Sequence, residues 1–169
     1  MIFIIILLAI ITGILIFFFI IKPFFMQQNI INRYHFTVDW GGSRISFTEV
    51  SGLDIEIEAI SFREGGSLED SFRKIPGLRK FSDITLKRGI IKGDNDFYAW
   101  INTKQLDTIE KRDITISLLN GNHEPVVVWK VRNAFPVKLS GPELDATGSD
   151  IAIETLVLTH EGLTVENNP

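Results

Sequence analysis

The side chains best suited to binding a metal ion are spread thinly along this sequence. The three histidines, His35, His123 and His160, lie far apart and have none of the short spacings that place metal ligands on one hairpin or helix. Asp94 and Asp96 form an Asp-x-Asp pair whose carboxylates are suitable ligands for a hard cation. Because the pair stands where a helix is expected to begin, helix capping explains it without a cation. We therefore predict no metal site.

The motifs of the common catalytic chemistries are also missing from the sequence. It contains no phosphate-binding glycine loop and no Gly-x-Ser-x-Gly elbow, and the absence of cysteine excludes thiol catalysis and disulfides. Glu64 and Glu69 come nearest to a pair of acid–base carboxylates. Nothing around them points to the two different environments that a general acid and a general base require. We predict no catalytic residue and no cofactor, and therefore a protein that is not an enzyme.

Charge is concentrated between Ser61 and Ile90, where the two signs are separated along the chain. The acidic group comes first and the basic group second: Glu64, Glu69 and Asp70, then Arg73, Lys74, Arg79 and Lys80. A solvated loop is one interpretation of such a segment. Connections of this length are uncommon unless they are functional or disordered. We interpret the segment as a surface that contacts another molecule.

Glycine and proline divide this charged segment into the parts of a hairpin arm. A strand is expected to end at Phe62, and Gly65-Gly66 should interrupt it because paired glycines accept positive φ. Pro76-Gly77 favours a type II turn, after which a strand resumes at Phe81. The expected structure is a long arm between two strands.

The strand expected after the arm, from Ile84 to Ile90, has an apolar and a polar face. Ile84, Leu86 and Ile90 share the first face with Arg88, while Lys87 lies on the second. We expect Lys87 and Arg88 to face the solvent or a neighbouring molecule.

Alternating hydrophobicity predicts further strands in the rest of the chain. They are expected at residues 34–40, 44–50, 53–62, 112–119, 126–131 with an extension over 134–139, and 151–160. Gly41-Gly42 should join the first two of these as a hairpin, and Pro136 marks a possible edge or bulge. In 53–62 the apolar phase changes between Ala59 and Ile60, which indicates a bulge or a strand that passes between two sheets. Such strands build sandwiches and barrels.

One helix is expected, over about residues 95–106. Phe97, Trp100 and Ile101 form an apolar stripe along it, which we assign to the core. The whole pattern is that of a mainly β domain with a single helix.

The first 25 residues differ in composition from the remainder. Met1 to Ile21 is apolar apart from Thr12 and Gly13, and a helix of this length would span a bilayer core. Alternatively, the segment is not translated and the protein starts at Met26. We favour a mis-assigned start for residues 1–25 and one domain over 26–169, with a membrane anchor as the alternative. The excess of 21 acidic over 17 basic residues does not favour nucleic-acid binding.

Three motifs give the chain a family resemblance. They are Phe62 to Gly66 (FREGG), Pro76 to Phe81 (PGLRKF) and Thr85 to Gly89 (TLKRG). Together with the FYAWI helix they resemble the inner tube protein of contractile phage tails and related contractile injection systems. The similarity extends over roughly Tyr34 to Glu166.

This resemblance implies a fold and an assembly. The fold would be two packed antiparallel sheets, in a sandwich or barrel-like arrangement, with one flanking helix and a long hairpin arm. Six subunits would close a ring, rings would stack around a lumen that conducts DNA or protein cargo, and the arm would contact the adjacent ring. The expected interface residues are Glu64, Gly65, Gly66, Glu69, Asp70, Arg73, Lys74, Pro76, Gly77, Arg79, Lys80, Lys87 and Arg88.

The implied partners are further copies of the chain, together with sheath, baseplate and tube-capping proteins. Assembly would take place in the bacterial cytoplasm, before the tube becomes part of a phage tail-like or extracellular particle. Three alternatives stay open: a membrane-anchored β-sandwich, a carbohydrate-binding module, and a secretion-system ring protein of related fold. The resemblance does not separate a phage tail from a headless injection particle.

Overall fold

We describe residues 30–42, 46–103 and 109–167 of a computed structural model. The chain divides into two compact units, Met1–Ile31 and Asn32–Pro169, and the strands and the helix named below belong to the second. The hypotheses for residues 1–25 and for a start at Met26 lie outside the described residues. Within those residues, no helix combines the length and the apolar character that a bilayer crossing requires.

The described part of the chain is mainly β-structure, as the sequence predicts. Its helix is α2 (Asp96–Ile101), shorter than expected, although residues 104–108 are outside the description. Its strands are β1 (Phe36–Asp39), β2 (Glu49–Ser51), β3 (Ile55–Phe62), β4 (Arg73–Phe81), β5 (Ile84–Gly89), β6 (Arg112–Leu119), β7 (Pro125–Ser140), β8 (Ile153–Thr159) and β9 (Gly162–Asn167). The last of these, β9, was not predicted.

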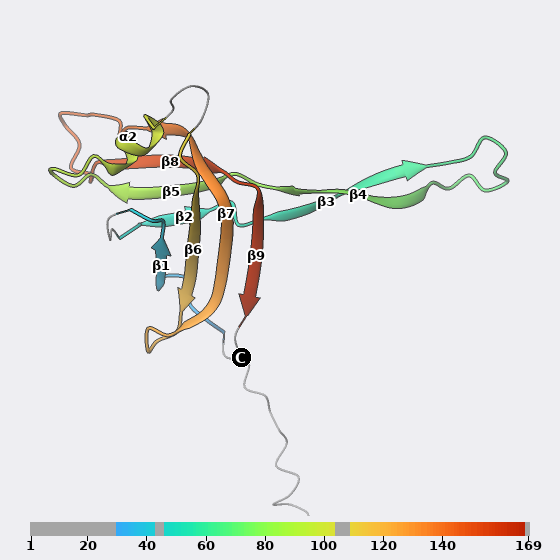
Figure 1. The fold of residues 1–169 in the computed structure, drawn as a ribbon, viewed down its shortest axis with the longest axis horizontal. Coiled ribbons are helices and arrows are strands. Elements are labelled where there is room, and N and C mark those ends of the chain that lie inside the picture. Colours follow the sequence, from blue (N-terminus) through green and yellow to red (C-terminus); the bar gives the residue numbers. More distant parts are fainter. Residues whose placement is uncertain (1–29, 43–45, 104–108, 168–169) are drawn as a thin grey trace, which may run out of the picture. The chain divides into compact units, whose positions relative to one another are not determined.

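Strand β7 links two sheet layers, because it is 16 residues long and curved. Its first half pairs with β6 and β9, and β1 extends that layer beyond β6. Its second half pairs with β8, followed by β5 and β2. All these pairings are antiparallel, and the register of β7 against β8 shifts next to Pro136, where a bulge was expected. Figure 1 shows both layers.

The core lies between the two layers and under α2. Ile84, Leu86, Leu156 and Leu158 come from the second layer, and all four are fully buried. Further buried residues belong to the first layer, the helix and the segment after β1: Ile114, Ile116, Val131, Phe97, Trp100 and Trp40. The helical stripe around Phe97 and Trp100 is therefore core, as predicted.

One expected local pairing differs from the structure. The segment that includes β2 was predicted to form a hairpin with the first strand, but β2 pairs with β5 and β1 pairs with β6. The change places β1 and β2 in different layers. In contrast, the Asn120-Gly121-Asn122 turn joins β6 to β7 as a hairpin, with the backbone N–H of Asn120 donating to Glu124 at 2.9 Å.

Arg112 covers the aromatic core at the end of α2. Its guanidinium lies 4.5 Å from the ring centre of Trp100 and 5.3 Å from that of Trp40. The indole N–H of Trp100 donates to the backbone oxygen of Glu110 at 2.9 Å. The Glu110 carboxylate in turn accepts a 2.9 Å hydrogen bond from Arg112. This contact stabilises the cation over the rings.

Glu110 is expected to contribute to acid sensitivity. The hydrogen bond from Arg112 lowers the pKa of its carboxyl below the ordinary value of 4.5. A lowered folded-state pKa contributes stability above the unfolded-state pKa, and this contribution is lost as the pH falls through the folded-state value. Thermal unfolding from about pH 6 to about pH 3 should therefore show a smaller loss of melting temperature in Glu110→Gln than in the wild type. Equal losses would contradict this assignment.

Candidate functional site

A two-stranded arm formed by β3 and β4 is the main candidate site, because both of its faces are open to solvent. Neither strand pairs with the seven-stranded sheet, and every residue of β3 is exposed. The arm extends the β2–β5 pair, since β3 follows β2 and β4 precedes β5 along the chain. Figure 1 shows it leaving the sheets as a separate ribbon. The sequence-based expectation of a long arm is correct.

The root of the arm is fixed by backbone contacts. Gly52, just before β3, has φ +86°, and a Cβ atom placed there would lie 2.0 Å from the backbone oxygen of Asp83. The N–H of Ser82 donates to the oxygen of Asp54 at 3.4 Å. Across the same root, Nε2 of His160 lies 3.1 Å from the oxygen of Ser82. These contacts connect the arm to the end of β8.

The acidic residues of the predicted interface lie in the loop at the tip of the arm. Arg63 organises this loop: its guanidinium donates to the backbone oxygen of Glu69 at 3.1 Å and lies 3.5 Å from the carboxylate of Asp70. Glu64 is exposed, and its backbone oxygen accepts from the N–H of Ser67. Gly65 and Gly66 have open space around them. These side chains are available to a partner.

The basic residues of the predicted interface lie along β4 rather than in a loop. Arg73 and Arg79 stand opposite Phe62 and Ile57 respectively. Lys74 donates to the Ser61 hydroxyl at 2.6 Å, and Lys80 pairs with Glu58 at 3.1 Å. The charge segregation in the sequence therefore becomes a spatial one, with acidic side chains at the tip and basic ones along one strand.

The turn predicted at Pro76-Gly77 is wrong, because both residues lie within β4. Proline is tolerated there since β4 is the edge of a two-stranded ribbon and the register shifts nearby, between Ile57 and Ala59. A Cβ atom on Gly77 would lie 3.0 Å from the backbone oxygen of Glu58. Glycine at this position lets the two strands approach closely. A bulge does occur in this ribbon, but its extra residue lies in β4, so the phase change in the sequence of β3 reflects apolar residues on both faces of the ribbon.

Sequence reasoning missed the apolar side chains that the arm exposes. These are Ile55, Ile57, Ile60, Phe62, Leu68, Phe72, Ile75 and Leu78, and each is between 39% and 103% exposed. The sequence of this strand had been interpreted as a bulge or as a strand that passes between two sheets. The available signal was that both parities of this strand carry large apolar residues, which one buried face does not require. A contiguous exposed apolar surface marks an interaction site.

Lys87 and Arg88 do not share an environment, although both were expected to face a neighbour or the solvent. Lys87 is at the surface and pairs with Glu49 at 3.0 Å. The expectation is wrong for Arg88, which is 1% exposed. Arg88 shares the inner face of β5 with the buried Ile84 and Leu86. Arginine is rarely fully buried unless it pairs with acidic groups.

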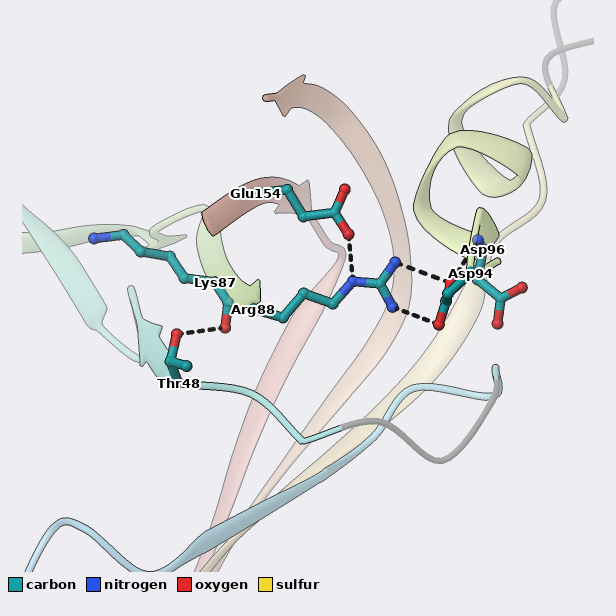
Figure 2. A network of polar contacts seen from close by, with 6 residues as sticks. All are labelled: Thr48, Lys87, Arg88, Asp94, Asp96 and Glu154. Atoms are coloured by element: carbon teal, nitrogen blue, oxygen red, sulfur yellow. Dashed lines mark hydrogen bonds and ion pairs between the residues drawn. The ribbon is translucent and has the colours of Figure 1, made fainter. Parts of the chain in front are cut away.

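Two carboxylates compensate the buried Arg88 guanidinium, as Figure 2 shows. Nε donates to Glu154 at 2.5 Å, while the two terminal nitrogens donate to the carboxylate of Asp94 at 3.1 and 3.2 Å. The guanidinium carbon also lies 3.8 Å from the ring centre of Phe97. Asp94 accepts a further hydrogen bond from the N–H of Asp96 at 3.0 Å. Arg88 thus joins β5, β8 and the start of α2, which is a structural role within the subunit.

No group of three or more potential metal ligands occurs among the residues that the structure describes. The carboxylate of Asp94 is occupied by its contacts to Arg88 and to the backbone N–H of Asp96.

Comparison with known proteins agrees with this architecture. A family model for the T4-like virus tail tube protein gp19 matches residues 32–164. Among curated protein sequences, none matches the chain. One solved structure that is similar belongs to the sheath–tube complex of an extracellular contractile injection system (PVC), in its extended state. It is 38% identical with a TM-score of 0.76, and the match covers 83% of this chain and 94% of the other.

Two further solved structures are similar to the chain. A protein from the tube-terminating cap of the anti-feeding prophage is 40% identical with a TM-score of 0.77, covering 83% of this chain and 93% of the other. Hcp1 from Flavobacterium johnsoniae is 12% identical with a TM-score of 0.53, covering 79% and 95% of the two chains, and shares the fold. The family match covers most of the described β-structure and includes the arm. The chain therefore belongs to the T4-like tail tube protein family.

Proposed function

We propose that this protein is a structural subunit of the inner tube of a contractile injection apparatus. Six subunits form a ring, and rings stack around a lumen that conducts DNA or protein cargo. The observation that carries the proposal is the arm, whose large apolar side chains are exposed to solvent in the described part of the subunit. In a member of a tube protein family, such a surface is expected to be buried against other subunits. Further copies of the chain would provide that cover.

The open sheet edges support the same assembly. Strand β1 pairs only with β6, β9 only with β7, and β2 only with β5, so one side of each is unpaired among the described strands. Exposed edges are a liability that closure through neighbouring subunits removes. Stacking identical rings head to tail is a heterologous association, which produces an open filament. A tube of stacked rings closes the sheet edges within each ring and grows by head-to-tail contacts between rings.

The proposed activity is mechanical. A contracting sheath drives the rigid tube through a target envelope, and no substrate is turned over. The partners are the sheath, the baseplate and a capping protein, in keeping with the sheath–tube and cap assemblies that contain the similar solved structures. Assembly in the cytoplasm would precede incorporation into an extracellular particle.

Reversing two charges on the arm should stop tube growth. Arg73→Glu combined with Lys74→Glu reverses the charge at the start of β4, next to the acidic loop at the tip of the arm. Both residues are exposed, so the subunit should still fold. Exposed ion pairs contribute only about 0–1 kcal/mol each, so their expected role is register, whereas like charges brought together across an interface are costly. Negative-stain electron microscopy of purified protein should show tubes from the wild type and none from the variant.

The matched control is Arg73→Lys with Lys74→Arg, which preserves charge and should preserve tubes. Circular dichroism and thermal unfolding check that all three proteins fold alike. Tubes of normal length from the charge-reversed variant would contradict a role for these residues in assembly. A wild-type protein that stays monomeric under all assembly conditions would contradict the proposed function itself.

A further inference from the structure

The outer half of the arm presents a combined apolar and basic face. Side chains alternate between the two faces of a ribbon, and residues directly opposite each other share a face. In β3, Ile60 and Phe62 have the same parity, and their partners in β4 are Ile75 and Arg73. We name these four residues the distal face. Its three apolar members are between 39% and 51% exposed.

The bulge determines which way the distal face points. Between the pairs Ile57–Arg79 and Ala59–Pro76, β3 advances by two residues while β4 advances by three. The alternation of β3 therefore continues through the bulge, and Ile60 lies on the side opposite to Ile57. The extra residue in β4 brings Ile75 onto the same side as Ile60. The distal face therefore carries apolar residues from both strands of the arm.

A second exposed surface has the complementary character. The β7–β8 loop, residues 141–152, carries two strongly exposed apolar residues, Leu144 at 87% and Ile151 at 79%. Its charged residues are all acidic, namely Glu143, Asp145 and Asp150. Hydrogen bonds from Thr147 lower the pKa of the Asp145 carboxyl, so this group is ionised at neutral pH. The loop therefore combines apolar and negative groups where the distal face combines apolar and positive groups.

The two surfaces lie at opposite ends of the subunit. Strand β5 runs from the arm root at Ile84 to Gly89, and β8 begins opposite Gly89, directly after the loop. The N–H of Ile90 donates to Ala152 at 3.0 Å, which fixes the end of the loop at that side. Figure 1 shows the arm and the β7–β8 loop extending in opposite directions from the sheets. Surfaces at opposite ends meet only between different copies, in a head-to-tail arrangement.

We propose that the distal face of the arm docks on the β7–β8 loop of another copy of this chain. Ile60, Phe62 and Ile75 pack against Leu144 and Ile151 of that copy. Arg73, on the same face, meets its acidic side chains, and Lys74, on the opposite face of the ribbon, adds positive charge beside it, which fixes the register between the copies. This inference rests on the proposed tube assembly and names the contact that propagates it.

Charge exchange tests the contact. Glu143→Lys with Asp150→Lys reverses the loop, leaving Asp145 and its turn intact, and should abolish tubes as the Arg73→Glu, Lys74→Glu pair does. All four substitutions in one chain should restore tubes, because the charges are again opposite. The pelleted fraction after ultracentrifugation should fall at least about tenfold in each double variant and return to near the wild-type fraction in the fourfold variant.

A control separates the specific contact from net charge. Glu124→Lys with Asp54→Lys adds the same positive charge at the β6–β7 turn and between β2 and β3, outside the β7–β8 loop. Combined with the reversed arm, it should not restore tubes. Rescue by this control, tubes from the loop-reversed variant alone, or no rescue by the fourfold variant would each overturn the contact. If the wild type still forms tubes while any of these results is obtained, the proposed function stands and only the contact between the arm and the β7–β8 loop is rejected.

Discussion

Replacing Arg88 by leucine is expected to destabilise the folded subunit by about 3 kcal/mol, because it removes the cation at the centre of a buried charge network. Arg88→Leu would leave Asp94 and Glu154, whose side chains are only 15% and 18% exposed, close together without compensation. Losing one partner of a buried pair costs more than the pair contributes, since the remaining charge stays desolvated. For a domain of this size, the melting temperature should fall by about 10 °C. Differential scanning fluorimetry or calorimetry measures the shift.

Its neighbour provides the matched control. Lys87→Leu removes an adjacent cation that pairs with Glu49 at the surface, and such pairs contribute about 0–1 kcal/mol. Arg88→Lys should lie between the two, because lysine retains the charge but cannot donate two parallel hydrogen bonds to Asp94. Equal melting temperatures for Arg88→Leu and Lys87→Leu would contradict the structural role of the network.

The same network has a consequence for assembly. Glu154 lies at the start of β8, immediately after the β7–β8 loop, and Asp94 lies before α2. Both are held by Arg88 at the end of the subunit away from the arm. The surface proposed to receive the arm is therefore supported by a buried ion pair rather than by the loop alone.

The features that the sequence predicted correctly are those governed by local periodicity. The alternation of Ile84, Leu86 and Arg88 identified the inner face of β5, and the stripe of Phe97 and Trp100 identified the buried side of α2. A bulge was expected in this part of the chain, and the register of the β3–β4 ribbon does shift there, although the extra residue lies in β4. These patterns need no knowledge of distant residues.

The features that the sequence could not predict depend on contacts between distant segments. Pro76-Gly77 satisfies the local rules for a turn, but pairing with β3 keeps both residues in an extended strand. Arg88 could be placed on an apolar face, yet its partner Glu154 is 66 residues away, so its burial was not evident. The exposure of Ile57 and Ile60 follows from the arm leaving the sheets, for which the sequence of β3 offers only the indirect signal of apolar residues on both faces.

The second large effect is expected at Gly52, where the arm meets the sheets. Its φ of +86° lies in the left-handed region, which costs a residue with a side chain about 1–2 kcal/mol. Gly52→Ala also places Cβ 2.0 Å from the oxygen of Asp83, 2.9 Å from its carbonyl carbon and 3.1 Å from Cα of Ile84. All three atoms belong to the backbone, so no side chain can rotate away. We expect a loss of at least about 3 kcal/mol, as overpacking adds to backbone strain.

Two other glycines separate the contributions at this position. Gly93 has φ +84° and nothing within 4 Å of where an added Cβ atom would lie, so Gly93→Ala measures the strain alone, and Gly66→Ala, in open space at the arm tip, provides the baseline. Chemical denaturation should rank the losses as Gly52→Ala, then Gly93→Ala, then Gly66→Ala. A Gly52→Ala variant no less stable than Gly93→Ala would mean that the arm root shifts to admit the methyl group. Because the root sets the orientation of the arm, such a shift should reduce the number of tubes even where the stability of the subunit is retained. Normal tubes together with normal stability would contradict a close backbone contact at this position.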